Sequence, residues 1–225
     1  MSSSIRLITA FAVPMGVTNF EGSSGLNQEL AQLFLAREAH GNAYSNKQRN
    51  SISQDEVFES SFDLFQWQDR CVQQLRDMCF QRLVTFIAQL SRLAPEAIKH
   101  WEVHADAWFH VTRHGGYFSA HNHPNASWSA VYCVSHGDDV PERPESAVTR
   151  FFDFKSNAMM YLDVANTQLS EPFGLGHRVF NLRAGDFLIF PSYLLHEVSP
   201  YFGQKERITV AMNCWFKDRR KNFPG

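Results

Sequence analysis

The sequence predicts a mainly β fold, a jelly roll flanked by a layer of N-terminal helices. From Val103 onward, short runs rich in Val, Phe, Tyr and Ile are separated by Gly, Pro, Asn and Asp, as in a strand-dominated sandwich. Before that point, apolar side chains recur every three or four residues, which indicates amphipathic helices. The chain of 225 residues is 44% hydrophobic, enough for one well-buried domain. We expect a single domain, with residues 1–100 as N-terminal strand and helical support and residues 101–217 as the β core.

The first hundred residues divide into a strand, helices and a loop. Met1–Pro14 has one positive side chain and a short apolar stretch broken by Thr and Pro, which predicts an edge strand rather than a signal peptide. Residues 27–40 have apolar side chains at helical spacing and precede Gly41, so a helix should end there. Residues 41–55 are polar and read as a loop. Residues 65–93 predict one long helix or two shorter ones, ending before Pro95.

The pattern of the remaining sequence, from about residue 104 onward, predicts about eight strands, a number that suits a jelly roll. They span residues 104–112, 116–121, 127–135, 147–154, 177–182, 186–190, 195–200 and 206–216. Residues 155–176 have weak periodicity and should form a long loop over one mouth of the barrel, where substrate selectivity often resides.

Charge and cysteine usage narrow the class of protein. The formal net charge of −2 gives no whole-protein attraction for nucleic acid or for an anionic membrane. The cysteines form no CxxC pair and no dense disulfide framework, and no apolar run reaches the length of a membrane span. We therefore expect a cytoplasmic protein with reduced thiols and no evident nucleic-acid or membrane partner. If the protein forms an oligomer, a homodimer is expected, because dimers are the commonest oligomers of soluble proteins.

His121-Asn122-His123 has the spacing of a metal site if it lies on a strand. Side chains at i and i+2 of a strand point the same way, with Cα atoms about 6.6 Å apart, so two imidazoles can converge on one ion. His196, on a later predicted strand, is the candidate third ligand. For an isolated His-x-His pair, histidines that cap turns or fill a polar cavity are an equally good interpretation.

Arg207 strengthens the metal interpretation. It follows His196 by eleven residues and opens an alternating strand, with Thr209 on the same strand face. A non-heme Fe(II) that binds a bidentate oxoacid and O₂ needs three protein ligands on one side and an open opposite side. The planar fork of a buried arginine suits the remote carboxylate of such an acid. Without the histidines, Arg207 would read as an ordinary surface or interface arginine.

Four stretches together resemble the 2-oxoglutarate- and Fe(II)-dependent oxygenases related to prolyl hydroxylases. The bacterial family in question reads His-x-His-Pro, Ser-Gly-Val-Tyr-Tyr, Gly-Asp-x-x-x-Phe-Pro-Ser-x-x-x-His-x-Val and Glu-Arg-Ile-x-Val. The corresponding stretches here are residues 121–124, 129–133, 185–198 and 206–210, and the resemblance covers about Trp108 to Phe216.

The resemblance implies a double-stranded β-helix of the cupin-like type and an oxygenase site. His121, His123 and His196 would ligate Fe(II), while Arg207 and Thr209 would hold the distal carboxylate of 2-oxoglutarate. O₂ would oxidise an unidentified substrate, which is hydroxylated with release of succinate and CO₂.

Three further residues are candidates for contact with the cosubstrate. Asn213 lies six residues past Arg207 on the same strand face, where it borders the reaction centre or satisfies a buried backbone group. Ser129 shares a face with Cys133, which replaces a family tyrosine and leaves the pocket roomier. Tyr117 lies four residues before His121, so on a regular strand its side chain faces the same cavity, unless the preceding glycines bend the strand. His110 replaces a frequent Asn, so its role as an oxoacid contact is open.

The triad departs from the usual pattern, since most such oxygenases have Asp or Glu where this chain has His123. Three neutral imidazoles leave the metal at +2, so iron binding should be weaker and more pH-sensitive. The carboxylates that could substitute are Asp106, Asp138, Asp139, Asp153 and Asp186. For Asp186, capping of the turn after Gly185 is the favoured role.

Three alternatives remain beside the oxygenase hypothesis. One is a cupin-like three-histidine dioxygenase that does not use 2-oxoglutarate, in which Arg207 binds a substrate carboxylate. Another is a non-enzymatic metal-binding β-sandwich. A hydrolase triad of Ser192, His196 and Asp186 is disfavoured because the chain lacks a nucleophile elbow. The primary substrate is not encoded in the metal-site residues.

Overall fold

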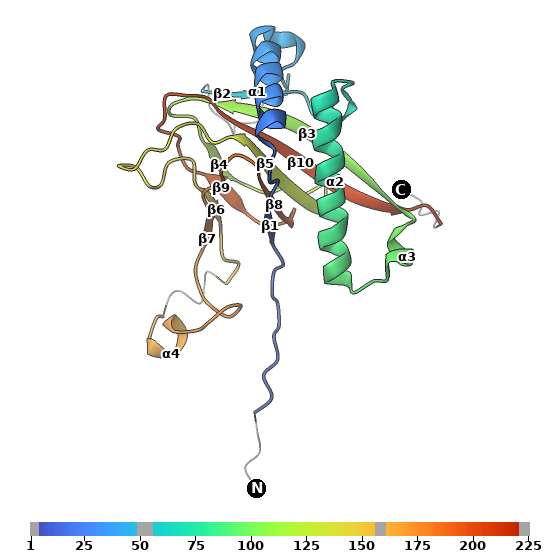
Figure 1. The fold of residues 1–225 in the computed structure, drawn as a ribbon. Helices are drawn as coiled ribbons and strands as arrows, with labels where there is room; N and C mark the ends of the chain where they lie inside the picture. Colours follow the sequence, from blue (N-terminus) through green and yellow to red (C-terminus); the bar gives the residue numbers. More distant parts are fainter. Residues whose placement is uncertain (1–4, 49–55, 156–160, 221–225) are drawn as a thin grey trace.

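Two antiparallel sheets form the β core of the computed structural model, which describes residues 5–48, 56–155 and 161–220 (Figure 1). In sheet order, the six-stranded sheet consists of β1 (Gly16–Asn19), β8 (Asp186–Pro191), β5 (Trp128–Ser135), β10 (Arg207–Asp218), β3 (Trp101–Thr112) and β2 (Val57–Glu59). The four-stranded sheet consists of β4 (Phe118–His121), β9 (His196–Val198), β6 (Thr149–Phe151) and β7 (Arg178–Phe180). The predicted mainly β fold is confirmed.

The eight predicted strands correspond to β3 through β10, with ends that differ by up to three residues. The predicted edge strand at Met1–Pro14 is wrong for its described part, because the first strand begins only at Gly16. β1 pairs with β8 from Gly16 opposite Ile189, and β8 ends two residues later. β8 therefore offers no pairing partner to the chain before Pro14, which runs away from the sheets with Ile5 98% exposed (Figure 1). Residues 1–4 lie outside the described part.

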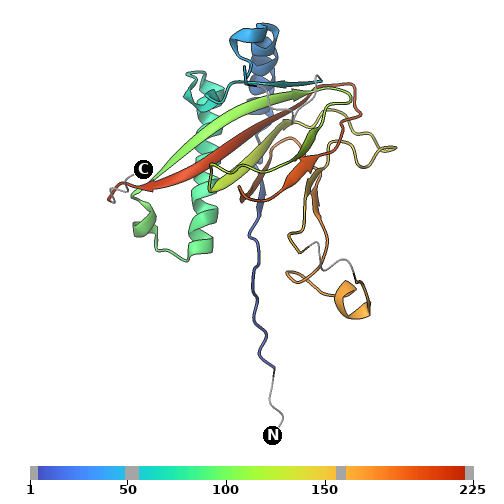
Figure 2. The same cartoon turned by 180° about the vertical axis from the view of Figure 1, so that it is seen from behind.

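Two helices cover the outer face of the large sheet (Figures 1 and 2). α1 (Ser24–Ala39) matches the prediction and is followed by Gly41 with a φ of 56°. The predicted 65–93 segment contains one long helix, α2 (Arg70–Ser91), which ends at Arg92 in the left-handed conformation. Short helical turns adjoin these helices: η1 (Gly41–Ala43), η2 (Leu64–Gln66) and α3 (Pro95–Ile98). The rest of the predicted 41–55 loop is described only through residue 48.

Strand alternation divides the interior into two apolar clusters. On β10, Ile208, Val210, Met212 and Cys214 face the helices, where they join the cluster that contains Leu30, Phe34, Leu75 and Phe109. The rings of Phe34 and Phe109 stack with centroids 4.2 Å apart, which fixes α1 against β3. The opposite face of β10 carries Arg207 and Thr209, and it looks into the space between the two sheets. A smaller apolar cluster fills part of that space: Cys133, Phe151, Leu182, Leu188, Phe190 and Leu194.

The predicted 155–176 loop contains α4 (Val164–Thr167), whose first turn is capped by the Asp163 carboxylate. Figures 1 and 2 show α4 beyond the end of the small sheet and clear of both sheets. The later part of the same loop, at Glu171, Pro172, Gly174 and Gly176, lines a pocket together with Phe151, Phe180 and Leu194. Residues 156–160 of the prediction lie outside the described part. No helix within the described ranges is both long and apolar enough to cross a membrane.

Candidate metal centre

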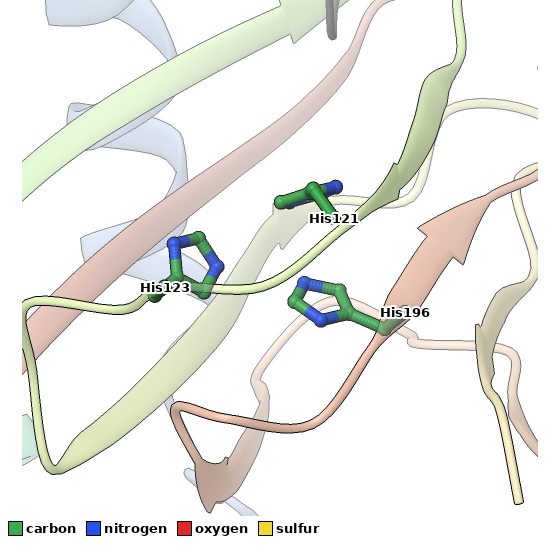
Figure 3. Close-up of side chains that lie close together, drawn as sticks. All are labelled: His121, His123 and His196. Carbon is green, nitrogen blue, oxygen red and sulfur yellow. The ribbon is translucent and has the colours of Figure 1, made fainter.

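The three predicted metal ligands converge at one end of the small sheet (Figure 3). His121 ends β4 and lies opposite His196, which begins β9. His123 lies just past the strand, where its backbone N–H donates to the Ser192 carbonyl at 2.9 Å. One ligand atom from each of the three side chains lies within 4.8 Å of those of the other two. This spread is compatible with three imidazoles on a single transition-metal ion.

Backbone carbonyls fix the orientation of two of the rings. Nδ1 of His121 lies 2.7 Å from the Ser119 carbonyl, and Nδ1 of His196 lies 2.9 Å from the Leu194 carbonyl. A carbonyl only accepts, so each Nδ1 carries the proton and donates it. Each Nε2 therefore keeps its lone pair for a metal, as in metal sites where a carbonyl holds the distal N–H of the ligand.

Burial keeps the imidazoles neutral. Burial lowers the pKa of His123 to about 4 and that of His196 to about 3, with the neighbouring imidazoles acting in the same direction. Burial also lowers the pKa of His121, against the opposing effect of the Ser119 carbonyl. Neutral imidazole is the form that coordinates, so the cluster is in its ligating state at pH 7.

Within the described ranges, the three histidines form the one group of His, Cys, Asp and Glu side chains arranged to hold a metal, and no carboxylate joins them. Asp186 caps its turn as predicted, accepting from Asn19 Nδ2 at 2.9 Å and from the Arg183 backbone N–H at 2.7 Å. The hydrolase arrangement is absent, since the hydroxyl of Ser192 pairs with Ser129 and Nδ1 of His196 pairs with a carbonyl.

Arg207 and Thr209 lie between the sheets, each only 3% exposed. The guanidinium of Arg207 makes no hydrogen bond or ion pair with any residue of the described ranges, and burial lowers its pKa. Across the strand pair from it, Thr112 has a buried Oγ1 that also lacks a hydrogen-bond partner there. A buried cation and a buried hydroxyl without partners are costly. Both fit an anionic ligand such as a carboxylate.

Ser129 and Asn213 form a hydrogen-bonded trio with Ser192. The Ser129 hydroxyl donates to Asn213 Oδ1 at 2.8 Å, so Ser192 must donate to Ser129 across their 2.8 Å contact. Asn213 thus bonds to a side chain rather than to a buried backbone group. Because the Ser192 carbonyl also holds the backbone of His123, the trio braces the segment that carries this ligand.

The strand that ends at His121 is not regular back to Tyr117, so the condition for Tyr117 to face the metal cavity is not met. β4 begins only at Phe118, and its pairing with β9 shifts register before His121. Gly115 adopts a φ of 90°, so the bend at the glycines does occur. Strand parity therefore no longer predicts which way the Tyr117 side chain points.

Sequence reasoning missed a polar chain beside the histidines. The Trp108 indole N–H donates to Nε2 of His110 at 3.0 Å, and Glu59 Oε2 lies 3.0 Å from the same nitrogen. The Asn46 amide donates to Glu59 Oε1 at 2.7 Å. The Trp108 and His123 ring centroids are 6.1 Å apart. Glu59 belongs to a three-residue strand, too short for a periodic signal, so no sequence pattern marks it.

Comparison with known proteins decides the family. Residues 106–213 match the model of a family described as "Putative 2OG-Fe(II) oxygenase". The chain carries a domain of this oxygenase family. It is an oxidoreductase, and the cofactors of the family are Fe(II) and 2-oxoglutarate. The resemblance inferred from the four sequence stretches is confirmed.

Solved structures with the same fold include several oxygenases. A Pseudomonas putida prolyl-4-hydroxylase is 20% identical with a TM-score of 0.58, over 92% of this chain and 94% of that one. A prolyl hydroxylase from Trichoplax adhaerens, in complex with a hypoxia inducible factor peptide, is 13% identical with a TM-score of 0.53, over 93% and 87%. HygX from Streptomyces hygroscopicus, with nickel and 2-oxoglutarate bound, is 11% identical with a TM-score of 0.51, over 90% and 83%. They support the double-stranded β-helix fold. No curated protein matches the chain.

Proposed function

We propose that this oxygenase hydroxylates an unidentified primary substrate, with O₂ as oxidant and with conversion of 2-oxoglutarate to succinate and CO₂. The observation that carries the proposal is the pairing of a neutral three-histidine cluster with a buried arginine that lacks a counter-ion, in one barrel. The first group suits a metal ion with open coordination positions, and the second suits a carboxylate.

His121, His123 and His196 would hold the iron, each through one imidazole nitrogen. When bound, Fe(II) supplies the site for oxoacid chelation and for O₂ activation. The Ser119 and Leu194 carbonyls keep two of the rings oriented before metal arrives. Apolar rings shield His196 from water, since the centroids of Phe151 and Phe190 lie 5.2 Å and 4.9 Å from its own.

Arg207 and Thr209 would bind the distal carboxylate of 2-oxoglutarate. The guanidinium offers two parallel N–H donors, and the Thr209 hydroxyl adds a third donor from the same face of β10. Thr112, with its unpartnered hydroxyl, lies directly across the strand pair from Arg207 and can donate a fourth. A dicarboxylic oxoacid would thus satisfy the buried polar groups that the protein leaves open.

Ser129 and Asn213 would act next to His123, because their hydrogen bonds hold Ser192, whose carbonyl accepts from the His123 backbone N–H. Tyr117 remains a candidate contact to the cosubstrate. The primary substrate stays unassigned. We further propose that the chain is one domain, that it acts in the cytoplasm without a nucleic-acid or membrane partner, and that it forms a homodimer.

Turnover of 2-oxoglutarate tests this function. The iron-loaded protein should convert 2-oxoglutarate to succinate, slowly even without the primary substrate, and Arg207→Ala should abolish the conversion. Arg76→Ala, which removes a half-exposed arginine of α2 paired with Asp77, is the matched control. Unchanged turnover in Arg207→Ala would contradict the proposal. Oxygen uptake with a thiol or diketone but none with 2-oxoglutarate would favour the three-histidine dioxygenase instead.

A further inference from the structure

The barrel has a second opening, at the end away from the histidines. A cavity of about 320 Å³ lies there, between the 136–147 segment and the residues that follow β7. Its lining includes His136, Asp138, Val140, Leu182, Tyr201 and Arg207. Strand register fixes its place: on β6, Phe151 lies opposite His196, whereas Thr149 lies opposite Phe180 at the other end. The cavity therefore adjoins the end of the barrel where the distal carboxylate would bind.

Arg207 forms part of the wall of this cavity and is its one buried cation without a partner in the described ranges. The other arginines in the lining are engaged at the surface, Arg183 with Asp139 and Arg143 with Glu145. The Asp138 carboxylate accepts from two backbone N–H groups, at Gln204 and Lys205. An acid that reaches this end of the barrel thus meets one available guanidinium.

A fixed tyrosine holds the cavity open. The Tyr201 hydroxyl donates to the Lys205 carbonyl at 2.7 Å and accepts from the Asp138 backbone N–H at 2.8 Å. Gly137 and Gly203 enclose it so closely that a Cβ on either would collide with the phenol. Tyr201 therefore cannot rotate into the cavity or donate to a ligand.

The inner side of the same region carries a small side chain. Cys133 lies opposite Thr209 on the neighbouring strand, and its buried thiol packs in the apolar cluster with Leu182 and Leu188. A closed pocket would reject an acid with one more methylene by steric strain. Here, the wall beside Arg207 is a cavity rather than packed side chains.

On the basis of the proposed function, we propose that the cosubstrate site is open-ended at Arg207 and also accepts a 2-oxo dicarboxylic acid one methylene longer than 2-oxoglutarate. The oxoacid end of either compound would bind at the histidines. The distal carboxylate of the longer acid would lie at the mouth of the cavity, still on Arg207.

The test is an anaerobic titration of the Fe(II)-loaded protein with 2-oxoglutarate and with 2-oxoadipate, read from the visible band of an iron-chelated oxoacid. The two dissociation constants should agree within about tenfold. Val140→Trp places an indole into the cavity and should weaken 2-oxoadipate binding by about tenfold or more, with 2-oxoglutarate binding changed by less than about threefold. Glu142→Trp, on the same loop but outside the lining, is the matched control and should leave both unchanged.

The outcomes separate the two proposals. Binding of 2-oxoglutarate with 2-oxoadipate more than about a hundredfold weaker would overturn the open-ended site and leave the proposed function standing. Equal weakening of both acids in Val140→Trp would also overturn it. No band with either acid, despite bound iron, would overturn the proposed function itself.

Discussion

Nε2 of His110 lies 3.0 Å from the Glu59 carboxylate and also accepts the indole N–H of Trp108 at 3.0 Å. An imidazole nitrogen cannot accept from one group and donate to another at once. Nε2 carries either a lone pair or a proton, so it accepts from Trp108 in one tautomer of His110 and donates to the Glu59 carboxylate in the other. Trp108, His110 and Glu59 thus form a largely buried polar chain next to the metal cluster.

This arrangement predicts unequal effects of two substitutions at Glu59. Glu59→Gln keeps a polar amide within reach of both His110 and Asn46, so the free energy of unfolding should change by less than about 1 kcal/mol. Glu59→Ala removes the partners of both His110 and Asn46 and should cost about 1–3 kcal/mol. Urea unfolding of the metal-free protein measures both. Equal losses in the two variants would show that an amide cannot replace the carboxyl group in these contacts.

The Ser129 trio should affect metal binding without any contact to the metal. Ser129→Ala removes the donor to Asn213 and the acceptor for Ser192, so the segment that holds His123 loses its brace. Groups that orient a ligand typically change metal affinity by about 10- to 100-fold. We expect a loss in that range for Co(II), measured by calorimetry. Ser127→Ala, which removes a hydroxyl bonded to the Cys214 carbonyl, should leave the affinity within about threefold and is the control.

Stability of the metal-free protein should depend on pH through the histidine cluster. In the folded state the pKa of His123 is lowered to about 4 and that of His196 to about 3, so between these values and about 6.5 the unfolded chain binds more protons. The free energy of unfolding is therefore highest, as far as these two groups are concerned, above about pH 6.5, and it decreases as the pH drops toward 4. Metal affinity of the folded protein should change little over this range and fall only near pH 4 and below, where protons compete for the ligand nitrogens.

Denaturant unfolding from pH 7.5 to 4.5 measures this slope. The double variant His123→Gln/His196→Gln, which cannot titrate at these positions, should have a shallower slope than the wild type. Identical slopes would show that the two imidazoles do not titrate in the folded protein as their burial implies.

The packing around Tyr201 predicts a sharp contrast between two glycines. A Cβ at Gly203 would overlap the phenol ring, so Gly203→Ala should destabilise the protein by about 1–3 kcal/mol. Gly25, in α1, has open space where its Cβ would lie, so Gly25→Ala should stabilise by about 0.5–1 kcal/mol. Thermal unfolding of the two variants distinguishes the effects. A neutral Gly203→Ala would contradict the account of a fixed Tyr201.

The sequence predicted the core of the fold because the long strands carry strong local signals. Residues 207–216 alternate between the helix-facing cluster and the barrel interior, and the His-x-His spacing placed two imidazoles together. The pairing of β1 with β8 depends on contacts between residues about 170 positions apart, so no local pattern marks Gly16 as the start of the first strand. Glu59 was missed for the same reason, because its role comes from the register of β2 against β3.

Counting alternate residues along a strand predicts the direction of a side chain only where the strand is regular. Arg207 and Thr209 share a face because β10 pairs with β3 in unbroken register from Arg207 to Asp218, and the structure places both inside the barrel. Tyr117 precedes a strand whose register shifts, so counting residues from His121 could not place its side chain. The five aspartates named as possible substitute ligands lie outside the three-histidine cluster. The sequence could not exclude them, because it does not say which side chains lie close together in space.

The most direct test of the account is the anaerobic complex of the protein with Fe(II) and 2-oxoglutarate. A visible charge-transfer band should form in the wild type and in Arg76→Ala. In Arg207→Ala it should be lost or need at least about tenfold more 2-oxoglutarate, while Fe(II) still binds. No band in the wild type despite bound iron, or a band unaffected by the loss of Arg207, would contradict the assignment of the cosubstrate site.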